Sequence, residues 1–211
     1  MLDCTTDSYN DIYAPWLAKP GELLALGDYK PGETLLDLCG GTGAVTKAAL
    51  ALGASTASIT LLDLNPRITM LGVAVYKSRA EDLGRYAWEY FDLVVCRQAM
   101  GYLDPHRVFP AVATVLKPGG RFVFNTFQKP ERYGWKQKSF EGHRFAEAHA
   151  TFGKTVWHIQ VRLGLIPRFD LSTFRYWSEE DLLPLLTADF KVALIQHGRG
   201  LHWLCIRKDT P

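Results

Sequence analysis

The sequence predicts an α/β fold built on a doubly wound, mostly parallel sheet of seven strands. Between residues 34 and 126, five short apolar segments alternate with helical patterns. Such alternation is typical of a parallel sheet that helices cover on both faces. Two more segments, 190–196 and 202–207, flank a glycine-containing turn and indicate an antiparallel hairpin at the end of the chain. A glycine-rich loop, residues 39–43, directly follows the first strand and marks the end of the sheet where a ligand would bind.

The composition is that of one globular domain. The chain has 211 residues, of which 47% are hydrophobic and 22% charged, so it is long enough to bury a substantial core. No apolar run approaches the roughly 18 residues of a membrane span, and the N-terminus lacks a signal peptide. We therefore expect a cytoplasmic protein that does not contact a membrane. The four cysteines lie far apart without a Cys-x-x-Cys pair, which favours reduced thiols over a metal site.

The first strand and the loop behind it are the most informative stretch. Residues 34–38 form a short apolar run that fits a buried strand, and a helical pattern follows from Ala44 to about Leu52. The glycines between them allow a tight turn and let a ligand approach bare backbone amides. The first turn of the helix points unsatisfied N–H groups at the same place. Asp37, at the strand end, is poorly suited to a pyrophosphate and well suited to a cationic or hydroxylated ligand.

Four further parallel strands are expected after this loop. Asn65 and Pro66 fit the N-cap and the first position of a helix between the second and third strands. Another helix is expected from about Pro105 to Leu116, with Pro110 in its first turn or at a kink. The four strands are expected at residues 58–63, 73–76, 91–96 and 121–126.

Polar residues gather at the carboxyl ends of these strands. Asp37 and Asp63 end the first and second strands, and residues 79–82 and 97–100 follow the third and fourth. Ligands of doubly wound sheets bind beyond this edge, at the point where the strand order reverses. We therefore expect these four positions to converge on one site.

Two segments of the single domain, residues 1–211, are expected to enclose that site. Apolar and aromatic residues from Tyr9 to Trp16, including Tyr13, form one stripe of an amphipathic helix. The stripe fits core packing or a helical lid formed by residues 1–30. Residues 127–177 break the strand–helix alternation and predict an inserted, β-rich substrate cover. The excess of basic residues in this segment fits an anionic substrate or a solvated face.

Five short sequence motifs occur in an order and at a spacing that identify a protein family. They are LLDLCGGTG from Leu35, LLDL from Leu61, AEDL from Ala80, FDLVV from Phe91 and VLKPGGRF from Val115. Together they resemble the class I S-adenosylmethionine-dependent methyltransferases, in particular the small-molecule branch. The resemblance covers about residues 34–126 and the final hairpin, and it implies a Rossmann-like fold with S-adenosylmethionine as the cofactor.

The resemblance also implies where that cofactor binds. Its amino group would meet Asp37, and its ribose hydroxyls would donate to Asp63 in charge-assisted hydrogen bonds of about 1.5–3 kcal/mol each. Its adenine would lie against Ala80 and the residue after it. The full set of expected cofactor-binding residues is Tyr13, Asp37, Cys39, Gly40, Gly41, Gly43, Asp63, Leu64, Ala80, Glu81 and Arg97.

Two positions depart from the family pattern. Relatives commonly carry glycine where Cys39 stands, so we expect slightly less room near the methionine part of the cofactor. Many relatives carry an acid where Arg79 stands, and an arginine cannot accept the hydrogen bond of an adenine amino group. The adenine contact is therefore predicted at Ala80 and Glu81.

Two other functions compete with this interpretation. The Gly41-x-Gly43 pattern partly matches the dinucleotide fingerprint of an NAD(P)-dependent oxidoreductase, but the third glycine of that fingerprint is missing. A non-catalytic, cofactor-binding subunit with the same fold is the second alternative. Turnover with a labelled methyl donor separates this subunit from an enzyme.

The methyl acceptor is expected to be a small molecule, with an aromatic or acidic character. The loop at residues 96–100 lacks the Asn/Asp-Pro-Pro-aromatic motif used on planar amide and base nitrogens, and no nucleic-acid partner is expected. An O-, N- or C-nucleophile would attack the methyl group in line, within a closed pocket. His143 and His158 are candidate general bases. We expect no metal and a monomer or homodimer.

Overall fold

A computed structural model describes residues 18–68, 70–85, 89–126, 177–198 and 200–209. The expected lid helix around Tyr13 and nearly all of the 127–177 cover lie outside the described residues, as do His143 and His158. The strands are β1 (Leu35–Leu38), β2 (Ile59–Asp63), β3 (Ala74–Lys77), β4 (Phe91–Cys96), β5 (Leu116–Thr126), β6 (Phe190–Gly198) and β7 (Gly200–Arg207). The helices are α2 (Pro20–Leu26), α3 (Ala44–Ala51), α4 (Pro105–Val115) and α7 (Glu179–Leu186), with short 3-10 turns η1 (Thr56–Ser58), η2 (Ala80–Arg85) and η3 (Met100–Tyr102).

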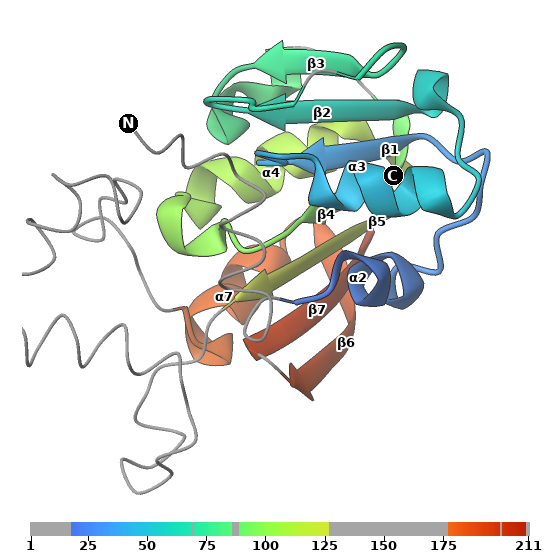
Figure 1. The fold of residues 1–211 in the computed structure, drawn as a ribbon. Helices are drawn as coiled ribbons and strands as arrows, with labels where there is room; N and C mark the ends of the chain where they lie inside the picture. Colours follow the sequence, from blue (N-terminus) through green and yellow to red (C-terminus); the bar gives the residue numbers. More distant parts are fainter. Residues whose placement is uncertain (1–17, 69, 86–88, 127–176, 199, 210–211) are drawn as a thin grey trace, which may run out of the picture.

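The strands form one seven-stranded sheet in the order β3-β2-β1-β4-β5-β7-β6 (Figure 1). Strands β1 to β5 are parallel, and β7 is antiparallel to both of its neighbours. The chain runs outward from β1 to β3 on one side and from β4 to β5 on the other, so the strand order reverses between β1 and β4. The predicted doubly wound, mostly parallel sheet is confirmed.

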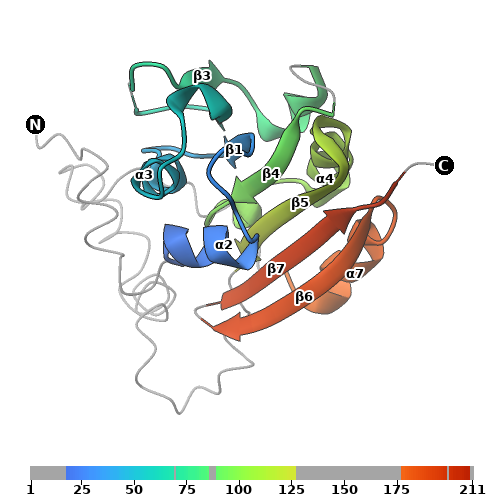
Figure 2. The ribbon, with the colours of Figure 1, turned by 90° about the vertical axis from the view of Figure 1, so that its right-hand side faces the viewer.

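Helices cover both faces of the sheet (Figure 2), with α2 and α3 on one face and α4 and α7 on the other. All four residues of β1 are buried, as a strand with helices on both faces requires. The α4/α7 face contains an aromatic cluster in which Phe124 stacks on Trp203 at 5.4 Å and on Phe122 at 4.8 Å between ring centroids. This packing anchors the antiparallel hairpin to the parallel part of the sheet.

The prediction of a helix after β2 is wrong. Residues 64–68 and 70–73 form bends and a turn. The Asn65 N–H donates to Oδ1 of Asp63 at 2.7 Å, and the Arg67 N–H donates to the Gly41 carbonyl at 2.9 Å. These bonds tie the segment to the strand end and to the glycine loop, so its N–H groups do not start a helix.

Strand β5 begins five residues earlier than expected. Leu116 pairs with Phe91 and Arg121 pairs with Leu93, so residues 117–120 bulge out of the ladder. Pro110 lies well inside α4, beyond its first turn. The bulge places Lys117 close to Asp92, at the beginning of β4.

Asp92 joins the beginnings of β1, β4 and β5. Its Oδ2 accepts hydrogen bonds from Thr34 N at 2.8 Å and Thr34 Oγ1 at 2.7 Å, and Lys117 Nζ donates to both carboxylate oxygens at 2.8 Å. Burial raises the pKa of Asp92, but the bonds from Lys117 and Thr34 outweigh burial and lower the pKa overall. The charged carboxylate of Asp92 therefore links the beginnings of three strands through hydrogen bonds.

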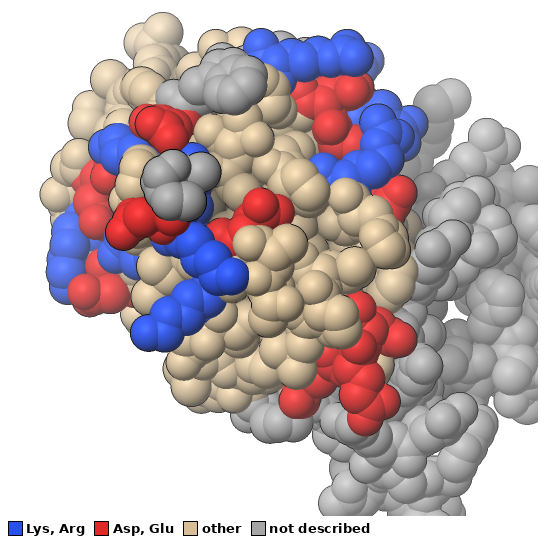
Figure 3. Space-filling model, turned by 180° about the vertical axis from the view of Figure 1, so that it is seen from behind, with Lys and Arg blue, Asp and Glu red and all other residues tan. Residues whose placement is uncertain are grey.

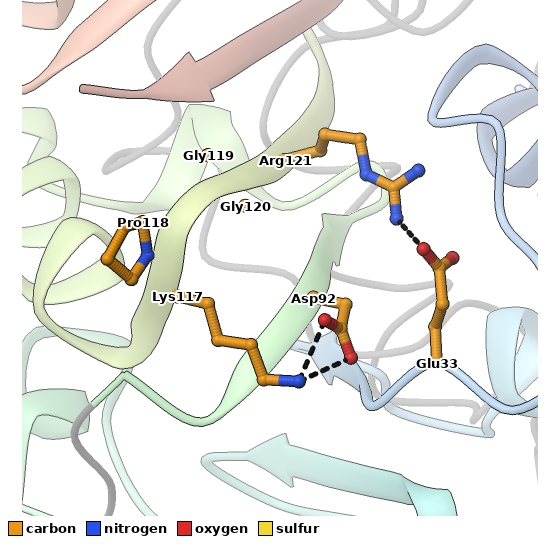
Figure 4. Close-up of a pocket in the computed structure, with 7 residues that line it drawn as sticks. All are labelled: Glu33, Asp92, Lys117, Pro118, Gly119, Gly120 and Arg121. Atoms are coloured by element: carbon orange, nitrogen blue, oxygen red, sulfur yellow. Dashed lines mark hydrogen bonds and ion pairs between the residues drawn. The ribbon is translucent and has the colours of Figure 1, made fainter. Parts of the chain in front are cut away.

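A polar pocket lies beside the Asp92–Lys117 ion pair (Figure 4). A second ion pair, between Arg121 and Glu33 at 2.5 Å, lines its other side. The pocket is at the amino ends of β4 and β5, the edge opposite Asp37 and Asp63. Its charged side chains are paired with one another, so it is a structural feature rather than a binding site.

We expect Asp92→Ala to lower the free energy of unfolding at pH 7 by about 2–3 kcal/mol, the scale of hydrogen bonds to a charged group. Because the pKa of Asp92 is lowered from 3.8, its contribution is present above that pH and is lost as the pH falls through the folded-state value. Denaturant titrations at pH 7 and near pH 3 measure both effects. Lys30→Ala, at an exposed ion pair with Asp28, is the control. An equal change in both variants would contradict the prediction.

Candidate functional site

The glycine loop between β1 and α3 has an unusual backbone. Cys39, Gly41 and Gly43 all have positive φ values, of 57°, 51° and 71°. A Cβ atom on Gly43 would lie 2.2 Å from Ile68, and one on Gly40 would lie 2.7 Å from Asp37 Cγ. Packing therefore requires glycine at 40, the positive φ favours glycine at 43, and Cys39 adopts a conformation that also favours glycine.

Asp37 is buried beneath this loop. Its Oδ2 accepts hydrogen bonds from Thr46 N at 3.0 Å and Thr46 Oγ1 at 2.8 Å. Gly43, the N-cap of α3, has no side chain to cap the helix, and Thr46 lies in the first turn. Asp37 thus supplies from the preceding strand the cap that Gly43 cannot provide.

The protonation of Asp37 is finely balanced. Burial raises its pKa from 3.8 to about 6, against the opposing effects of the Thr46 hydrogen bonds and the positive charge of Arg97. The negative charge of Asp63 raises the pKa further. These influences show that Asp37, Asp63 and Arg97 are electrostatic neighbours at the carboxyl edge.

Asp63 holds the other side of the loop. Its Oδ2 accepts a hydrogen bond from the Gly41 N–H at 3.0 Å, and its Oδ1 accepts one from Asn65. Around Gly41 the structure is open: among the described residues, a Cβ there would meet only Asp63 Oδ2, at 4.0 Å. The half-buried Asp63 carboxylate therefore lies next to open space above the Gly41 backbone.

Cys39 lies between several of the predicted site residues. A hydrogen bond with the Cys96 thiol and burial hold the pKa of Cys39 well above its usual value, and the charges of Asp63 and Glu81 raise it further. The ends of β1, β2 and β4 and the start of η2 therefore meet at this thiol. This raised pKa keeps the Cys39 thiol protonated.

The remaining expected residues border the same region. Ala80 is buried at the start of η2, and the Glu81 side chain is 7% exposed and ion-paired with Arg79 at 3.4 Å. Leu64 is 63% exposed beside Asp63, as an apolar surface for a ligand requires. Arg97 Nε donates to the Ala18 carbonyl at 2.7 Å and so joins the loop after β4 to the chain before α2.

Two features of this edge were missed by the sequence reasoning. Thr46, the partner of Asp37, looks like an ordinary helix residue, and only its spacing from Gly43 hints at a capping role. The second feature is a polar group at the ends of β4, β5 and β7, which consists of the buried residues Asn125 and His202 and the half-buried Gln98, whose side-chain amide atoms are buried. A polar residue within the otherwise apolar Leu201-His202-Trp203 stretch was the available signal.

Other kinds of site find no support in the described part of the chain. No group of three or more His, Cys, Asp or Glu residues there could hold a metal ion. None of the described helices is long and apolar enough to cross a membrane. On the face seen in Figure 3, acidic and basic side chains are interspersed and form no single basic patch of the kind that nucleic acids bind.

Comparisons with known proteins agree with the sheet and the loop. Residues 36–124 match the family model described as a methyltransferase domain. The chain is similar to the ubiquinone/menaquinone biosynthesis C-methyltransferase of Erwinia tasmaniensis, with 26% identity over 161 residues, or 70% of this chain and 59% of the relative. The corresponding Vibrio vulnificus enzyme is 24% identical over 71% of this chain and 57% of its own length. The chain thus spans less than two thirds of these curated relatives.

Solved structures share the fold. A putative methyltransferase of Haloferax volcanii, in complex with the Trm112 activator, superposes with a TM-score of 0.67 and 16% identity, covering 98% of this chain and 95% of that one. The 1,6-didemethyltoxoflavin-N1-methyltransferase of Burkholderia thailandensis, with bound S-adenosylhomocysteine, gives a TM-score of 0.61 at 18% identity, covering 96% and 85%. The resemblance to the class I S-adenosylmethionine-dependent methyltransferases that the sequence predicts is confirmed, because residues 36–124 match a methyltransferase domain and the glycine loop and strand order agree with that match.

Proposed function

We propose that this protein transfers the methyl group of S-adenosylmethionine to an O-, N- or C-nucleophile of a small molecule. The observation that carries the proposal is the carboxyl edge itself. Two carboxylates, Asp37 and Asp63, end adjacent strands on either side of a glycine loop that is open at Gly41. The family match over residues 36–124 supports the same chemistry.

The residues of this edge fit the parts of the cofactor. Asp63 has lone pairs beyond those that Gly41 and Asn65 use, and these would accept hydrogen bonds from the ribose hydroxyls. Asp37, with backbone carbonyls near Gly40, would bind the amino group. Leu64, Ala80 and Glu81 would border the adenine, with Arg97 and Cys39 near the methionine part.

When bound, the cofactor supplies an electrophilic methyl group on a sulfonium. The chain's own contribution is positioning and the exclusion of water, and positioning alone can supply up to about 7–11 kcal/mol of rate acceleration. Asp37 and Asp63 accept hydrogen bonds from Thr46 and Gly41 of the protein itself, so their carboxylates are preorganised. The Cys39 thiol, whose pKa is raised well above its usual value, stays protonated and adds no charge beside the reacting groups.

The acceptor class follows from the relatives and the sequence. The similar curated enzymes are named as C-methyltransferases of quinone biosynthesis, and the sequence favours an aromatic or acidic acceptor. We propose a small aromatic acceptor for this chain. General-base roles for His143 or His158, a cytoplasmic location and a monomeric or homodimeric state remain predictions.

Binding and turnover with the expected cofactor test the proposal. S-adenosylhomocysteine at 100 times its dissociation constant should stabilise the protein by about 2.7 kcal/mol in thermal unfolding, while NAD should not. A methyl-labelled donor incubated with a panel of small phenols and aromatic acids should then yield labelled product. Stabilisation by NAD alone would favour the oxidoreductase alternative. Binding without transfer to any acceptor would favour a non-catalytic subunit.

Asp63→Ala should weaken binding of S-adenosylhomocysteine at least tenfold, equivalent to about 1.4 kcal/mol. The reason is the loss of an acceptor for the ribose hydroxyls. Asp63→Asn retains one oxygen that can still accept from Gly41, so it separates ribose binding from support of the loop. Calorimetry on both variants, with Asp28→Ala as a distant control, measures the effect. Wild-type affinity in both Asp63 variants would refute the ribose assignment.

Asp37 should make cofactor binding depend on pH. The pKa of Asp37 is raised to about 6, so the neutral form predominates below that pH. If the charged form binds the cofactor's ammonium group, affinity for S-adenosylhomocysteine should rise about tenfold from pH 5 to pH 7 as the proton leaves. Asp37→Asn keeps an acceptor for Thr46 but cannot ionise, so its affinity should change little over this range. Parallel pH profiles for the two proteins would contradict the amino-group assignment.

A further inference from the structure

A group of buried polar side chains lies next to the cofactor edge. We name Gln98, Asn125 and His202 the polar cluster. Gln98 follows β4, Asn125 is the penultimate residue of β5, and His202 is near the start of β7. The Gln98 N–H donates to Asn125 Oδ1 at 2.9 Å, and Asn125 and His202 are cross-strand partners in the antiparallel ladder.

The cluster projects from one face of the sheet. Val123, two residues before Asn125, packs in the core beneath α2 and α3, while Phe122 and Phe124 pack on the α4/α7 face. Because side chains alternate along a strand, Asn125 lies on the α2/α3 face. Its directly paired partner His202 lies on the same face. The charge of Glu22, on α2, accordingly influences the pKa of His202.

Four polar atoms of this cluster find no hydrogen-bond partner among the described residues. They are Gln98 Oε1, Gln98 Nε2, Asn125 Nδ2 and His202 Nε2, and all four are buried. Asn125 is only 1% exposed and His202 7% exposed. Buried polar groups in native proteins are almost always paired, so four unpaired atoms on three neighbouring residues call for a ligand.

The backbone provides a second, independent sign of function. Gln98 has φ 61°, in the left-handed region that residues with a side chain seldom adopt. Its N–H bond to Asn125 holds this conformation. Residues in such conformations gather at ligand sites, where the surrounding structure over-determines them.

The cluster adjoins the proposed cofactor site. Cys96, at the end of β4, pairs with Leu38 at the end of β1, so the loop carrying Gln98 runs beside the glycine loop. Arg97, between Cys96 and Gln98, is close enough to Asp37 to lower its pKa. A ligand held by the cluster would therefore lie beside a cofactor held by the carboxyl edge.

The chemistry of the cluster selects its ligand. Asn125 Nδ2 and Gln98 Nε2 are amide donors, and Gln98 Oε1 is an acceptor. Burial lowers the pKa of His202, opposed by the Glu22 carboxylate, so its imidazole is neutral near pH 7. The cluster thus has no net charge and offers both donors and acceptors, which suits a neutral oxygen better than a carboxylate or an ammonium.

We propose that Gln98, Asn125 and His202 bind a hydroxyl or carbonyl oxygen of the methyl acceptor. This inference rests on the proposed methyl transfer, because it identifies the second substrate's place in that same site. An oxygen there accepts from the two amides, and a hydroxyl also donates to the imidazole or to Gln98 Oε1. An ordered water could satisfy the same atoms, and the experiment separates the two cases.

The probes are p-cresol and toluene, which differ by one hydroxyl group. Isotope-labelled protein is titrated with each probe, with and without S-adenosylhomocysteine, while the side-chain amide signals of Gln98 and Asn125 and the ring signals of His202 are followed. The test variants are Gln98→Met and His202→Leu. Gln196→Met is the matched control, because Gln196 is the exposed partner of His202 on β6.

We expect p-cresol to shift all three sets of side-chain signals and toluene to leave them in place. The dissociation constant of p-cresol should rise at least tenfold in Gln98→Met and His202→Leu and stay at the wild-type value in Gln196→Met. Both test variants should unfold at or above the wild-type temperature, since they remove Gln98 Oε1 and Nε2 or His202 Nε2, buried atoms that find no partner among the described residues. Their affinity for S-adenosylhomocysteine should be unchanged.

Three results would overturn the proposal. They are an absence of shifts at saturating p-cresol, an unchanged p-cresol constant in both test variants, and a fall in unfolding temperature in both. The first two would mean that water alone occupies the cluster, and the third that it is structural. A failure of S-adenosylhomocysteine to bind the wild type would instead count against the proposed function, while the titrations without it still report on the cluster.

Discussion

The hydrogen bonds between the buried carboxyl of Asp37 and Thr46 are the interaction on which the site depends. They join the end of the central strand β1 to the first turn of α3 across the glycine loop. The φ of 71° at Gly43 favours glycine, which has no side chain, so the helix is not capped by its own N-cap residue. A loss of capping costs a helix about 0.5–2 kcal/mol. Asp37 prevents this loss from within the core.

The loop is fixed from its other side by backbone contacts that converge on Asp63 and its neighbours. The Gly41 N–H bonds the Asp63 carboxylate, the Gly41 carbonyl accepts from Arg67, and the Cys39 N–H donates to the Leu62 carbonyl. With both sides held, Cys39 is kept in a left-handed conformation that costs a residue with a side chain about 1–2 kcal/mol. The carboxylates of Asp37 and Asp63, which we propose bind the cofactor, therefore also hold the glycine loop in its conformation.

This double role explains which sequence-based expectations failed. Asn65 and Pro66 have the residue types of a helix start, yet Asp63 and Gly41 take the hydrogen bonds of Asn65 and Arg67. The sequence predicts Leu116 at the end of a helix, yet Leu116 begins β5 because it pairs with Phe91. The bulge that follows lets the Lys117 ammonium group donate a hydrogen bond to Asp92. In each case a contact between distant residues outweighed a local preference. The strands with continuous apolar runs, by contrast, were predicted correctly.

The sequence by itself determined the layers of this protein, the parallel direction of its first five strands and the edge at which we propose that its ligands bind. Apolar runs, glycines and strand-end carboxylates are local features, and their physical meaning does not depend on distant residues. Only the tertiary structure decided that Asp37 caps α3 and that Gln98, Asn125 and His202 lie together without partners. Burial and hydrogen-bond pairing depend on which strands become neighbours. Asn125 and His202 are far apart in the chain, and no periodicity of the sequence records that they meet.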